Sequence, residues 1–227
     1  MPAPDSSPTA RTPGLTTSSY AVLGLLALRP WSAYELTQQA ARSLRFAWPK
    51  SERLLYAEPK KLVRHRLASV DHERVGKRTR AIYTITADGR AALGAGASTR
   101  PAPPMFEVEA LVRVLFAENG TLDDLHAALD QLASDAADLR EQVVTINSDY
   151  LDGGHPFPER THLSVLFATF QLELFDLVAR WVEFAKTEIE AWPAADDPGP
   201  TDRILEILEI IGDRRPVLDA LADRTPG

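Results

Sequence analysis

The fold of this chain is decided by residues 31–93, which read WSAYELTQQAARSLRFAWPKSERLLYAEPKKLVRHRLASVDHERVGKRTRAIYTITADGRAAL. Cations gather in and around this stretch, because residues 1–95 hold 15 Lys and Arg against 7 Asp and Glu, whereas the rest of the chain holds 10 against 25. The overall net charge of −7 therefore hides a front half at +8 and a back half at −15. Such a division predicts a polyanionic partner for the front half.

The basic half begins with the pattern of a helix-turn-helix. Thr16–Leu28 opens with four hydroxyl residues, any of which could cap a helix, and continues with the apolar run Tyr20–Leu28. It predicts a buried central helix, which a following proline ends. Ser32 and Glu35 have the spacing of a capping box, so a second helix is expected to start there. A turn over residues 46–50 then leads to a third helix, which begins at Ser51 and carries several cations.

Two short extended runs follow the third helix, at about Ser69–Arg74 and Arg80–Ile85. The second run alternates polar and apolar residues, as a half-buried strand does. The connection over residues 75–79 offers Gly76 for the turn and cations that suit a phosphate backbone. A further helix is expected after Thr86. Three helices followed by a basic two-stranded wing describe a winged helix-turn-helix, whose third helix enters the major groove of DNA.

Four motifs follow one another through this segment, and they are Tyr20-x-x-Leu23-Gly24-Leu25-Leu26, Ser32-x-Tyr34-Glu35-Leu36, Ser51-x-x-x-Leu55-Tyr56-x-x-Pro59-x-x-Leu62 and Tyr83-x-Ile85-Thr86-x-x-Gly89-Arg90. Their order over about residues 18–93 resembles the amino-terminal domain of the PadR family of bacterial transcriptional regulators. The resemblance implies a dimeric regulator, usually a repressor, that binds a short palindrome in double-stranded DNA and often responds to a small molecule.

The resemblance also implies roles for Ser51 and Tyr56, near the phosphates and base edges of DNA. Tyr56 has an alternative, which is to pack its ring under the helix. The cations on the third helix and the wing add groups that pair with phosphate or guanine. The complete set of predicted DNA contacts is Ser51, Arg53, Tyr56, Lys60, Lys61, Arg64, Lys77, Arg78 and Arg80.

Two positions in the third helix depart from a regular pattern. Pro59 lies inside the helix, where it removes a backbone hydrogen bond at a cost of ~3 kcal/mol. We therefore expect either a kink at Pro59 or a restart of the helix at Glu58. Many relatives place glycine near the end of this helix, whereas this chain reads Arg64-His65-Arg66-Leu67. If Arg66 takes the left-handed capping position, its backbone is strained.

The acidic half contains two apolar stripes with heptad spacing, joined by a short turn with glycine and proline. The first stripe is Leu122, Leu125, Leu129, Leu132, Ala136, Leu139, Val143, Ile146 and Tyr150, and the second is Leu163, Phe167, Phe170, Leu174, Leu177, Trp181 and Phe184. Two such helices predict an antiparallel hairpin. A lone hairpin leaves apolar edges exposed, and a symmetric dimer is the commonest way to cover them.

The predicted dimerisation residues are Leu122, Leu125, Leu129, Leu132, Leu139, Phe170, Leu174, Leu177 and Trp181. The alternative is an intramolecular bundle, which would use a helix over Met105–Glu118 and a tail helix from Thr201. That tail helix is apolar on several faces, so we expect it to be buried. An effector pocket is expected between the winged domain and the hairpin or at the dimer seam. Its candidate lining residues, each of which could instead be ordinary core, are Phe106, Phe116, Phe170, Trp181 and Phe184.

The sequence argues against several other classes of protein. The chain has no cysteine, and its five histidines lack the i, i+4 partners of a zinc site, so no metal or cofactor is expected. No phosphate-binding loop or nucleophile elbow occurs, and we therefore expect no catalytic residues and no enzyme. Neither an unbroken run of eighteen apolar residues nor a secretory signal is present. The protein is expected to be cytoplasmic and to have no membrane-spanning helix.

The predicted fold class is mainly α with a small β-wing, in which an antiparallel helical dimerisation domain follows the winged helix-turn-helix. The predicted division is a disordered arm (1–16), the winged helix-turn-helix domain (17–95), a linker (96–104), a helical dimerisation and effector domain (105–192) and a C-terminal helical extension (193–227). The leading hypothesis is a DNA-binding transcriptional repressor whose effector is a small hydrophobic or aromatic molecule. The alternative is a winged-helix protein–protein adaptor that does not bind DNA.

Overall fold

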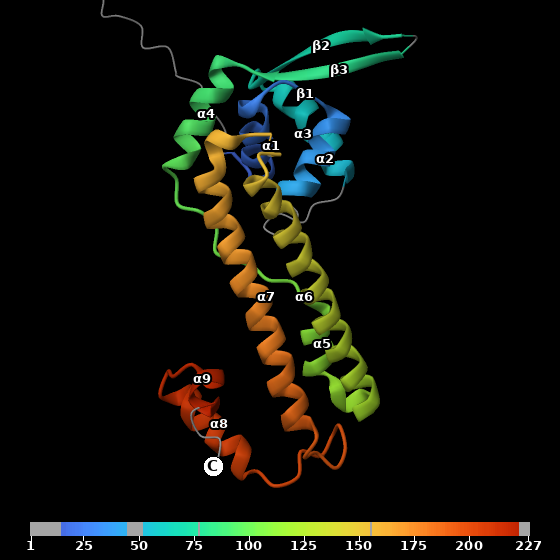
Figure 1. Ribbon diagram of the computed structural model, residues 1–227, viewed down its shortest axis with the longest axis vertical. Coiled ribbons are helices and arrows are strands. Elements are labelled where there is room, and N and C mark those ends of the chain that lie inside the picture. Colours follow the sequence, from blue (N-terminus) through green and yellow to red (C-terminus); the bar gives the residue numbers. More distant parts are fainter. Residues whose placement is uncertain (1–14, 45–51, 77, 155, 223–227) are drawn as a thin grey trace, which may run out of the picture. The chain divides into compact units, whose positions relative to one another are not determined.

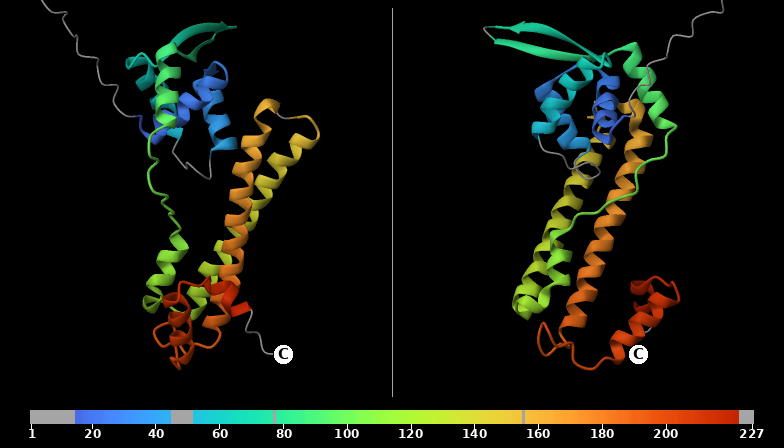
Figure 2. Two further views of the ribbon diagram at one scale, coloured as in Figure 1. Left: turned by 90° about the vertical axis from the view of Figure 1, so that its left-hand side faces the viewer. Right: turned by 180° about the vertical axis from the view of Figure 1, so that it is seen from behind.

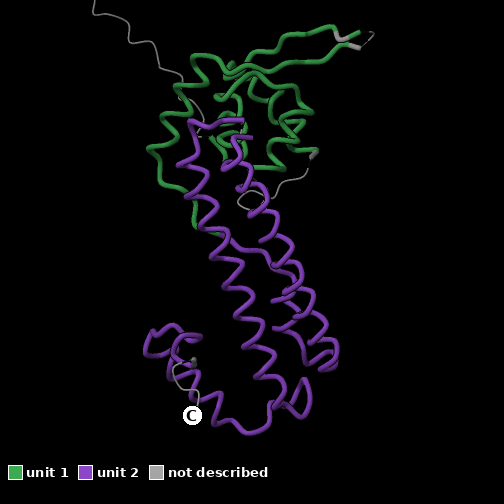
Figure 3. The backbone as a smooth tube through the Cα atoms, viewed as in Figure 1, with its two compact units in different colours: residues 1–104 green, residues 105–227 purple. Residues whose placement is uncertain are grey.

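The computed structural model describes residues 15–44, 52–76, 78–154 and 156–222, and Figure 1 shows their elements in order. The chain divides into two compact units, Met1–Pro104 and Met105–Gly227, which Figure 3 colours separately. Helices dominate both units, and a three-stranded antiparallel sheet lies in the first. The predicted fold class, mainly α with a small β-wing, is thereby confirmed.

The first unit is built around a buried helix. Its elements are α1 (Thr17–Leu28), β1 (Trp31–Ser32), α2 (Ala33–Ser43), α3 (Glu52–Arg64), β2 (Ala68–Val75), β3 (Arg78–Ile85) and α4 (Ala87–Ala97). The helix α1 contacts α2, α3, α4 and β3, so it is surrounded by the rest of the unit. Val22 and Leu23 are fully buried on it. The apolar stretch thus forms the predicted central helix, because its neighbours cover most of its apolar side chains.

The wing consists of β2 and β3, which pair antiparallel from Ala68 opposite Ile85 to Val75 opposite Arg78. The strands are therefore longer than the two predicted runs, and Gly76, which directly follows β2, has a φ of +62°. The strand β1 was not predicted. It is only two residues long and pairs with β3 opposite Tyr83, and a run so short has no periodicity that a sequence can reveal.

The helix α3 runs without a break through Pro59, so the restart that we considered at Glu58 does not occur. Pro59 is fully buried within the first unit. Burial of its ring offsets part of the cost of the missing backbone hydrogen bond. The adjacent Glu58 is also buried, at 6% exposure, so these two neighbouring positions lie on the inward-facing side of α3.

A left-handed turn ends α3 at Arg66, which has a φ of +60°, as we expected for this position. The Arg66 amide donates to the Val63 carbonyl at 2.9 Å, and the Leu67 amide donates to the Leu62 carbonyl at 2.9 Å. This pair of bonds is a Schellman motif, which satisfies the free carbonyls at the end of the helix. Because arginine has a Cβ, this backbone conformation is strained and has to be held by its surroundings.

Thr86 holds this turn and also starts the next helix. Its hydroxyl donates to the Arg66 carbonyl at 2.8 Å and accepts a hydrogen bond from the Gly89 amide at 3.0 Å. Its own amide donates to the Leu67 carbonyl at 3.1 Å. One threonine therefore caps α4 and ties it to the end of α3, so the position of the third helix depends on this junction.

Gly89 is the point of closest approach in the junction, and we expect it to tolerate no side chain. A Cβ added there would lie 2.0 Å from the Leu67 carbonyl oxygen and 2.9 Å from the Ile85 side chain. The substitution Gly89→Ala should therefore push α4 away from the end of α3 and destabilise the first unit by about 1–3 kcal/mol, the usual range for overpacking. Chemical denaturation followed by circular dichroism measures the loss.

Gly24→Ala in α1 is the matched control, because among the described residues nothing lies within 4 Å of a Cβ added at Gly24. Alanine favours the interior of a helix over glycine, so this variant should be at least as stable as the parent protein. Equal stabilities for Gly89→Ala and Gly24→Ala would show that the junction yields easily and does not fix α3.

The second unit is a long helical hairpin, preceded in the sequence by one shorter helix and followed by two. Its elements are α5 (Glu109–Leu115), a 3-10 turn η1 (Ala117–Asn119), α6 (Leu122–Leu151), a 3-10 turn η2 (Pro158–Arg160), α7 (Thr161–Ile189), α8 (Asp202–Gly212) and α9 (Val217–Ala222). The helices α6 and α7 lie antiparallel along their length (Figures 1 and 2), which confirms the predicted hairpin. Two ion pairs join them, Arg140–Asp176 at 2.7 Å and Lys186–Asp130 at 2.6 Å.

Two helix boundaries differ from the prediction. The helix α4 continues to Ala97, through Gly94 and Gly96, whereas we expected it to end near Leu93. The helix α5 covers only Glu109–Leu115, whereas we expected Met105–Glu118. Glycine lowers helix propensity without forbidding a helix, and the ends of a helix depend on capping more than on apolar periodicity.

The face of α7 that packs on α6 is not the stripe that the sequence made most visible. The buried positions on α7 are Ala168, Gln171, Phe175, Val182, Ala185 and Ile189. They include small and polar side chains, so they did not stand out as an apolar pattern. The predicted stripe lies beside this seam, and its members Leu163, Phe170 and Leu177 are 46%, 58% and 45% exposed. The helix α7 therefore has two neighbouring apolar faces, of which α6 covers one.

The C-terminal extension is only partly buried. The helix α8 packs with α9, and α9 contacts α7. Arg203 anchors α8 to the end of α7 by donating to Glu188 at 2.8 Å. Ile210 is buried, but four apolar side chains of α8 are exposed by 37–55%. They are Ile204, Leu205, Leu208 and Ile211. The expectation of a fully buried tail helix was thus wrong, because a two-helix extension covers only one face of α8.

Candidate nucleic-acid interface

The outer face of α3 carries the residues with which the first unit can meet a nucleic acid. Leu55 and Leu62 turn inward and are buried at 5% and 1% exposure. On the opposite side, exposed positions recur at helical spacing. They are Arg53, Tyr56, Ala57, Lys60 and Arg64, which we call the α3 stripe. The small side chain of Ala57 lies amid the three cations and allows the helix to approach a groove closely.

The three cations of the α3 stripe are available for an external partner. Within the part of the chain that the structure describes, no hydrogen bond or ion pair engages Arg53, Lys60 or Arg64. Tyr56 is 38% exposed, so its ring lies at the surface for part of its area and packs for the rest. This geometry suits both roles that the sequence allowed for Tyr56. An unpaired cationic stripe on one helix suits the phosphates and guanine edges of a DNA major groove.

Lys61 differs from the other predicted contacts, although it is on the same helix. Its ammonium donates to the Glu58 carboxylate at 2.9 Å and to the Ser19 hydroxyl at 3.2 Å. The Lys61 side chain is 36% exposed and points toward α1 through these contacts. Its charge is therefore used inside the first unit.

The wing contributes further cations to the first unit. Arg80 forms an ion pair with Glu73 directly opposite on β2, at 3.0 Å. Ser51 and Lys77 lie outside the described residues, as does the side chain of Arg78. Arg74 is exposed near the tip of β2 and was not among the predicted contacts. It precedes the turn, whereas the predicted wing contacts are the cations of the turn and of the following strand.

The helix α2 precedes α3 in the helix-turn-helix, and its start is firmly fixed. The Ser32 amide donates to Glu35 at 2.8 Å, and the Glu35 amide donates to the Ser32 hydroxyl at 3.2 Å, which confirms the predicted capping box. Hydrogen bonds from Ser32, assisted by the positive charge of Arg29, hold the pKa of Glu35 below its ordinary value.

Tyr34, on the first turn of α2, is 64% exposed. This residue belongs to the second of the four sequence motifs, and it adds an exposed aromatic ring on α2.

The predicted dimerisation residues fall into three groups. Leu125 and Leu129 are buried between α6 and α7 in a cluster with Val182, Ala185 and Ile189, so they hold the hairpin together. The half-buried members are Leu122, Leu132, Leu139, Leu174 and Trp181. Phe170 and Leu177 are exposed on the uncovered face of α7. Only this last group offers a partner a large apolar surface.

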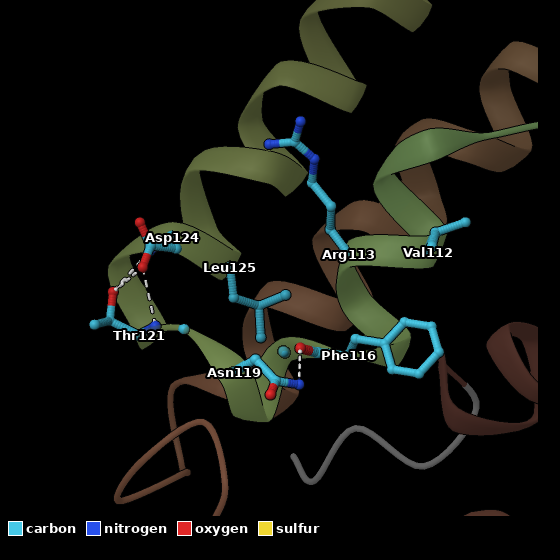
Figure 4. Close-up of a pocket in the computed structure, with 9 residues that line it drawn as sticks. Val112, Arg113, Phe116, Asn119, Thr121, Asp124 and Leu125 are labelled. Atoms are coloured by element: carbon cyan, nitrogen blue, oxygen red, sulfur yellow. Dashed lines mark hydrogen bonds between the residues drawn. The ribbon is translucent and has the colours of Figure 1, made fainter.

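A cavity of about 430 Å³ opens between α5, η1 and the start of α6 (Figure 4). Its lining residues are Val112, Arg113, Phe116, Ala117, Asn119, Gly120, Thr121, Asp124 and Leu125. Phe116 is the member of the predicted effector set that lines it. Arg113 pairs with Glu109 at 2.6 Å, and Asp124 is occupied by the Thr121 cap. The other candidates lie elsewhere, with Phe106 exposed ahead of α5 and Phe170, Trp181 and Phe184 on α7.

The helix α7 is apolar enough by length and composition to cross a membrane, with a mean hydropathy of 1.3 over its most apolar part. The expectation of no such helix is corrected to this extent. It rested on a search for unbroken apolar runs, which Glu173 and Asp176 interrupt. Core helices of soluble proteins meet the same criterion. Only 17% of this part of α7 is buried within the chain, so much of its apolar surface needs another cover.

No cluster of three or more His, Asp or Glu side chains that could hold a metal ion occurs among the described residues. The first unit offers a cationic binding surface on α3. It consists of the exposed cations of the α3 stripe and of the β2–β3 hairpin, in which Arg80 pairs with Glu73. The hydrogen bonds of Thr86 to the carbonyls of Arg66 and Leu67 fix both elements.

Comparison with known proteins agrees with this arrangement. Residues 22–95 match the model of the Transcriptional regulator PadR-like family. No curated protein matches the chain. Among solved structures, similar folds include Bacillus subtilis PadR in complex with operator DNA, which is 20% identical with a TM-score of 0.65. That match covers 77% of this chain and 99% of the other.

Two further structures extend the comparison. Bacillus subtilis PadR in complex with p-coumaric acid is 20% identical with a TM-score of 0.57, and the match covers 78% of this chain and 98% of that one. The Vibrio cholerae virulence activator AphA is 20% identical with a TM-score of 0.59, over 77% and 99% of the two chains. At these identities the likeness concerns the fold. These proteins are matched over nearly their whole length, so this chain has additional residues.

Proposed function

Since the chain belongs, through residues 22–95, to the PadR-like family of transcriptional regulators, we propose that it is a dimeric repressor that binds a palindromic operator in double-stranded DNA. The third helix, α3, enters the major groove, and the wing meets the flanking backbone. The observation that carries the proposal is the unpaired α3 stripe, with Arg53, Lys60 and Arg64 exposed on one helix face. The solved complex of a similar fold with operator DNA supports the same mode of binding.

The dimer forms in this proposal through the uncovered face of α7. Leu163, Leu166, Phe170 and Leu177 are 46%, 71%, 58% and 45% exposed, and they recur at heptad spacing. A second copy that presents the same face would bury these side chains by a two-fold axis, which is the commonest symmetry of oligomers. Two winged helices then reach two half-sites about one helical turn of DNA apart, so a palindrome is the matching target. Burial in a cytoplasmic dimer also accounts for the high hydropathy of α7.

A small hydrophobic or aromatic effector relieves DNA binding in this proposal. The complex of a similar fold with p-coumaric acid supports a ligand of this class. The aromatic side chains of the second unit are the candidate contacts, and Phe116 already lines a cavity of suitable size between α5 and α6. A substitution that fills this cavity, such as Ala117→Phe, offers a way to locate the effector once one is known.

The test of the function is fluorescence anisotropy with double-stranded DNA from upstream of the protein's own gene and with a scrambled duplex of equal composition, across a salt series. We expect tighter binding to the upstream fragment and a steep fall in affinity with salt, because released counterions contribute to binding. Absence of binding to either duplex at low salt would instead favour the adaptor, in which the cations of the first unit do not contact DNA.

A further inference from the structure

A small buried network connects the inner side of α3 to the first turn of α1. The Ser19 hydroxyl donates to the Glu58 carboxylate at 2.5 Å. The Lys61 ammonium donates to the same carboxylate oxygen at 2.9 Å and to the Ser19 hydroxyl at 3.2 Å. Ser19 and Glu58 are only 4% and 6% exposed. A carboxylate this deeply buried is costly unless a cation and hydrogen bonds compensate it, and here both do.

The hydrogen-bonding capacity of Ser19 is completely used in this network. Its single proton goes to Glu58, so the Thr16 hydroxyl, 2.9 Å away, has to donate to the Ser19 oxygen. The second lone pair of that oxygen accepts from Lys61. Thr16 in turn accepts from the Ser19 amide at 3.1 Å as the cap of α1. The start of α1 and the middle of α3 are thus joined by a chain of bonds that leaves Lys61 turned away from the α3 stripe.

We propose that Lys61 and Glu58 are positioning residues, which fix the recognition helix on α1, and that Lys61 makes no contact with DNA. The inference rests on the proposed DNA-binding function and sharpens it, because it divides adjacent lysines by role. Lys60 is exposed in the α3 stripe, where its charge is free for a phosphate. The charge of Lys61 is neutralised by Glu58 before DNA arrives. Without the Lys61 ammonium, the buried Glu58 carboxylate would move away from α1 or draw water in, and α3 would lose its fixed orientation.

Neighbouring lysines provide a matched pair of variants. Full-length protein is titrated by anisotropy into the scrambled duplex over a salt series. Lys60→Ala should reduce the slope of log affinity against log salt by about 0.9 for each protomer, as expected for the loss of one phosphate contact. Lys61→Ala should leave this slope unchanged. A fall in slope for Lys61→Ala equal to that for Lys60→Ala would overturn the proposal.

The positioning role of Lys61 is tested by the preference of the protein for one DNA sequence over another. A loss of stability alone does not change this preference in the protein that remains folded. The preference is the ratio of affinities for the upstream fragment and the scrambled duplex. We expect Lys61→Ala to lower it by about tenfold, the effect of ~1.4 kcal/mol, and Lys61→Arg to restore it, because arginine keeps a cation beside Glu58. An unchanged preference in Lys61→Ala would rule out the positioning role.

Glu58→Gln supplies a second variant should Lys61→Ala fail to fold. Glutamine keeps the shape of the side chain and an oxygen that accepts from Ser19, but it removes the charge that holds Lys61. The sequence preference should fall as in Lys61→Ala, while binding to the scrambled duplex is retained. Retained preference in Glu58→Gln would contradict the proposal. Failure of the parent protein to bind either duplex would contradict the proposed function itself, so the two failures are distinguishable.

Discussion

Replacing Arg53, Lys60 and Arg64 together by alanine is expected to weaken DNA binding by at least about a thousandfold near physiological salt. In a dimer the substitutions remove six cations, each worth about 0.9 in the slope of log affinity against log salt, so the slope should flatten by about 5. The three side chains are exposed, so the fold should be retained. Anisotropy with the upstream and scrambled duplexes measures both quantities.

The control for net charge is a triple substitution in the second unit, Arg113→Ala with Arg140→Ala and Arg180→Ala. These arginines are 67%, 46% and 61% exposed and form surface ion pairs, which contribute little to stability. The control changes the charge equally but leaves the α3 stripe intact, so the slope should stay close to that of the parent protein. Equal losses in both triple variants would mean that overall charge, and not the α3 stripe, governs binding.

Phe170→Asp is expected to convert the proposed dimer to a monomer. Phe170 is 58% exposed on the face of α7 that α6 leaves uncovered, so the substitution should spare the hairpin. In a symmetric seam it would bury two carboxylates among apolar side chains, which costs several kcal/mol for each unpaired charge. Light scattering should then give a mass near 25.0 kDa, that of one chain. Affinity for the upstream fragment should fall together with the mass, because one winged helix alone addresses only a half-site.

Thr169→Asp is the matched control, with the same new charge one position earlier. Thr169 is exposed, and its hydroxyl donates to the Val165 carbonyl within the helix at 2.8 Å. The neighbouring position points to a different side of the helix, so the dimer should survive. If Phe170→Asp remains a dimer, the interface lies on another surface, and the exposed apolar side of α8 becomes the next to examine.

The stripe on α3 and the hairpin of the second unit were both accessible from sequence, for the same physical reason. Each depends on a local period that the chain repeats often enough to be visible. Exposed cations at helical spacing marked the outer face of α3, and a sustained heptad predicted α6 almost to the residue. The capping box at Ser32 was likewise visible, because capping involves residues only three apart.

Features that depend on contacts between residues far apart in the chain could not be predicted from the sequence. Lys60 and Lys61 are adjacent in the sequence, and the burial of Glu58 against Ser19, some forty residues earlier, is what draws Lys61 inward. The two faces of α7 posed the same difficulty, since the more apolar of them proved to be the uncovered one. By itself, the sequence determined the helices, the wing and the charge of the binding surface, because these follow from local periodicity and capping. Only the tertiary structure decided which side of α7 is buried and which cation is free, because burial and pairing depend on what packs against a side chain.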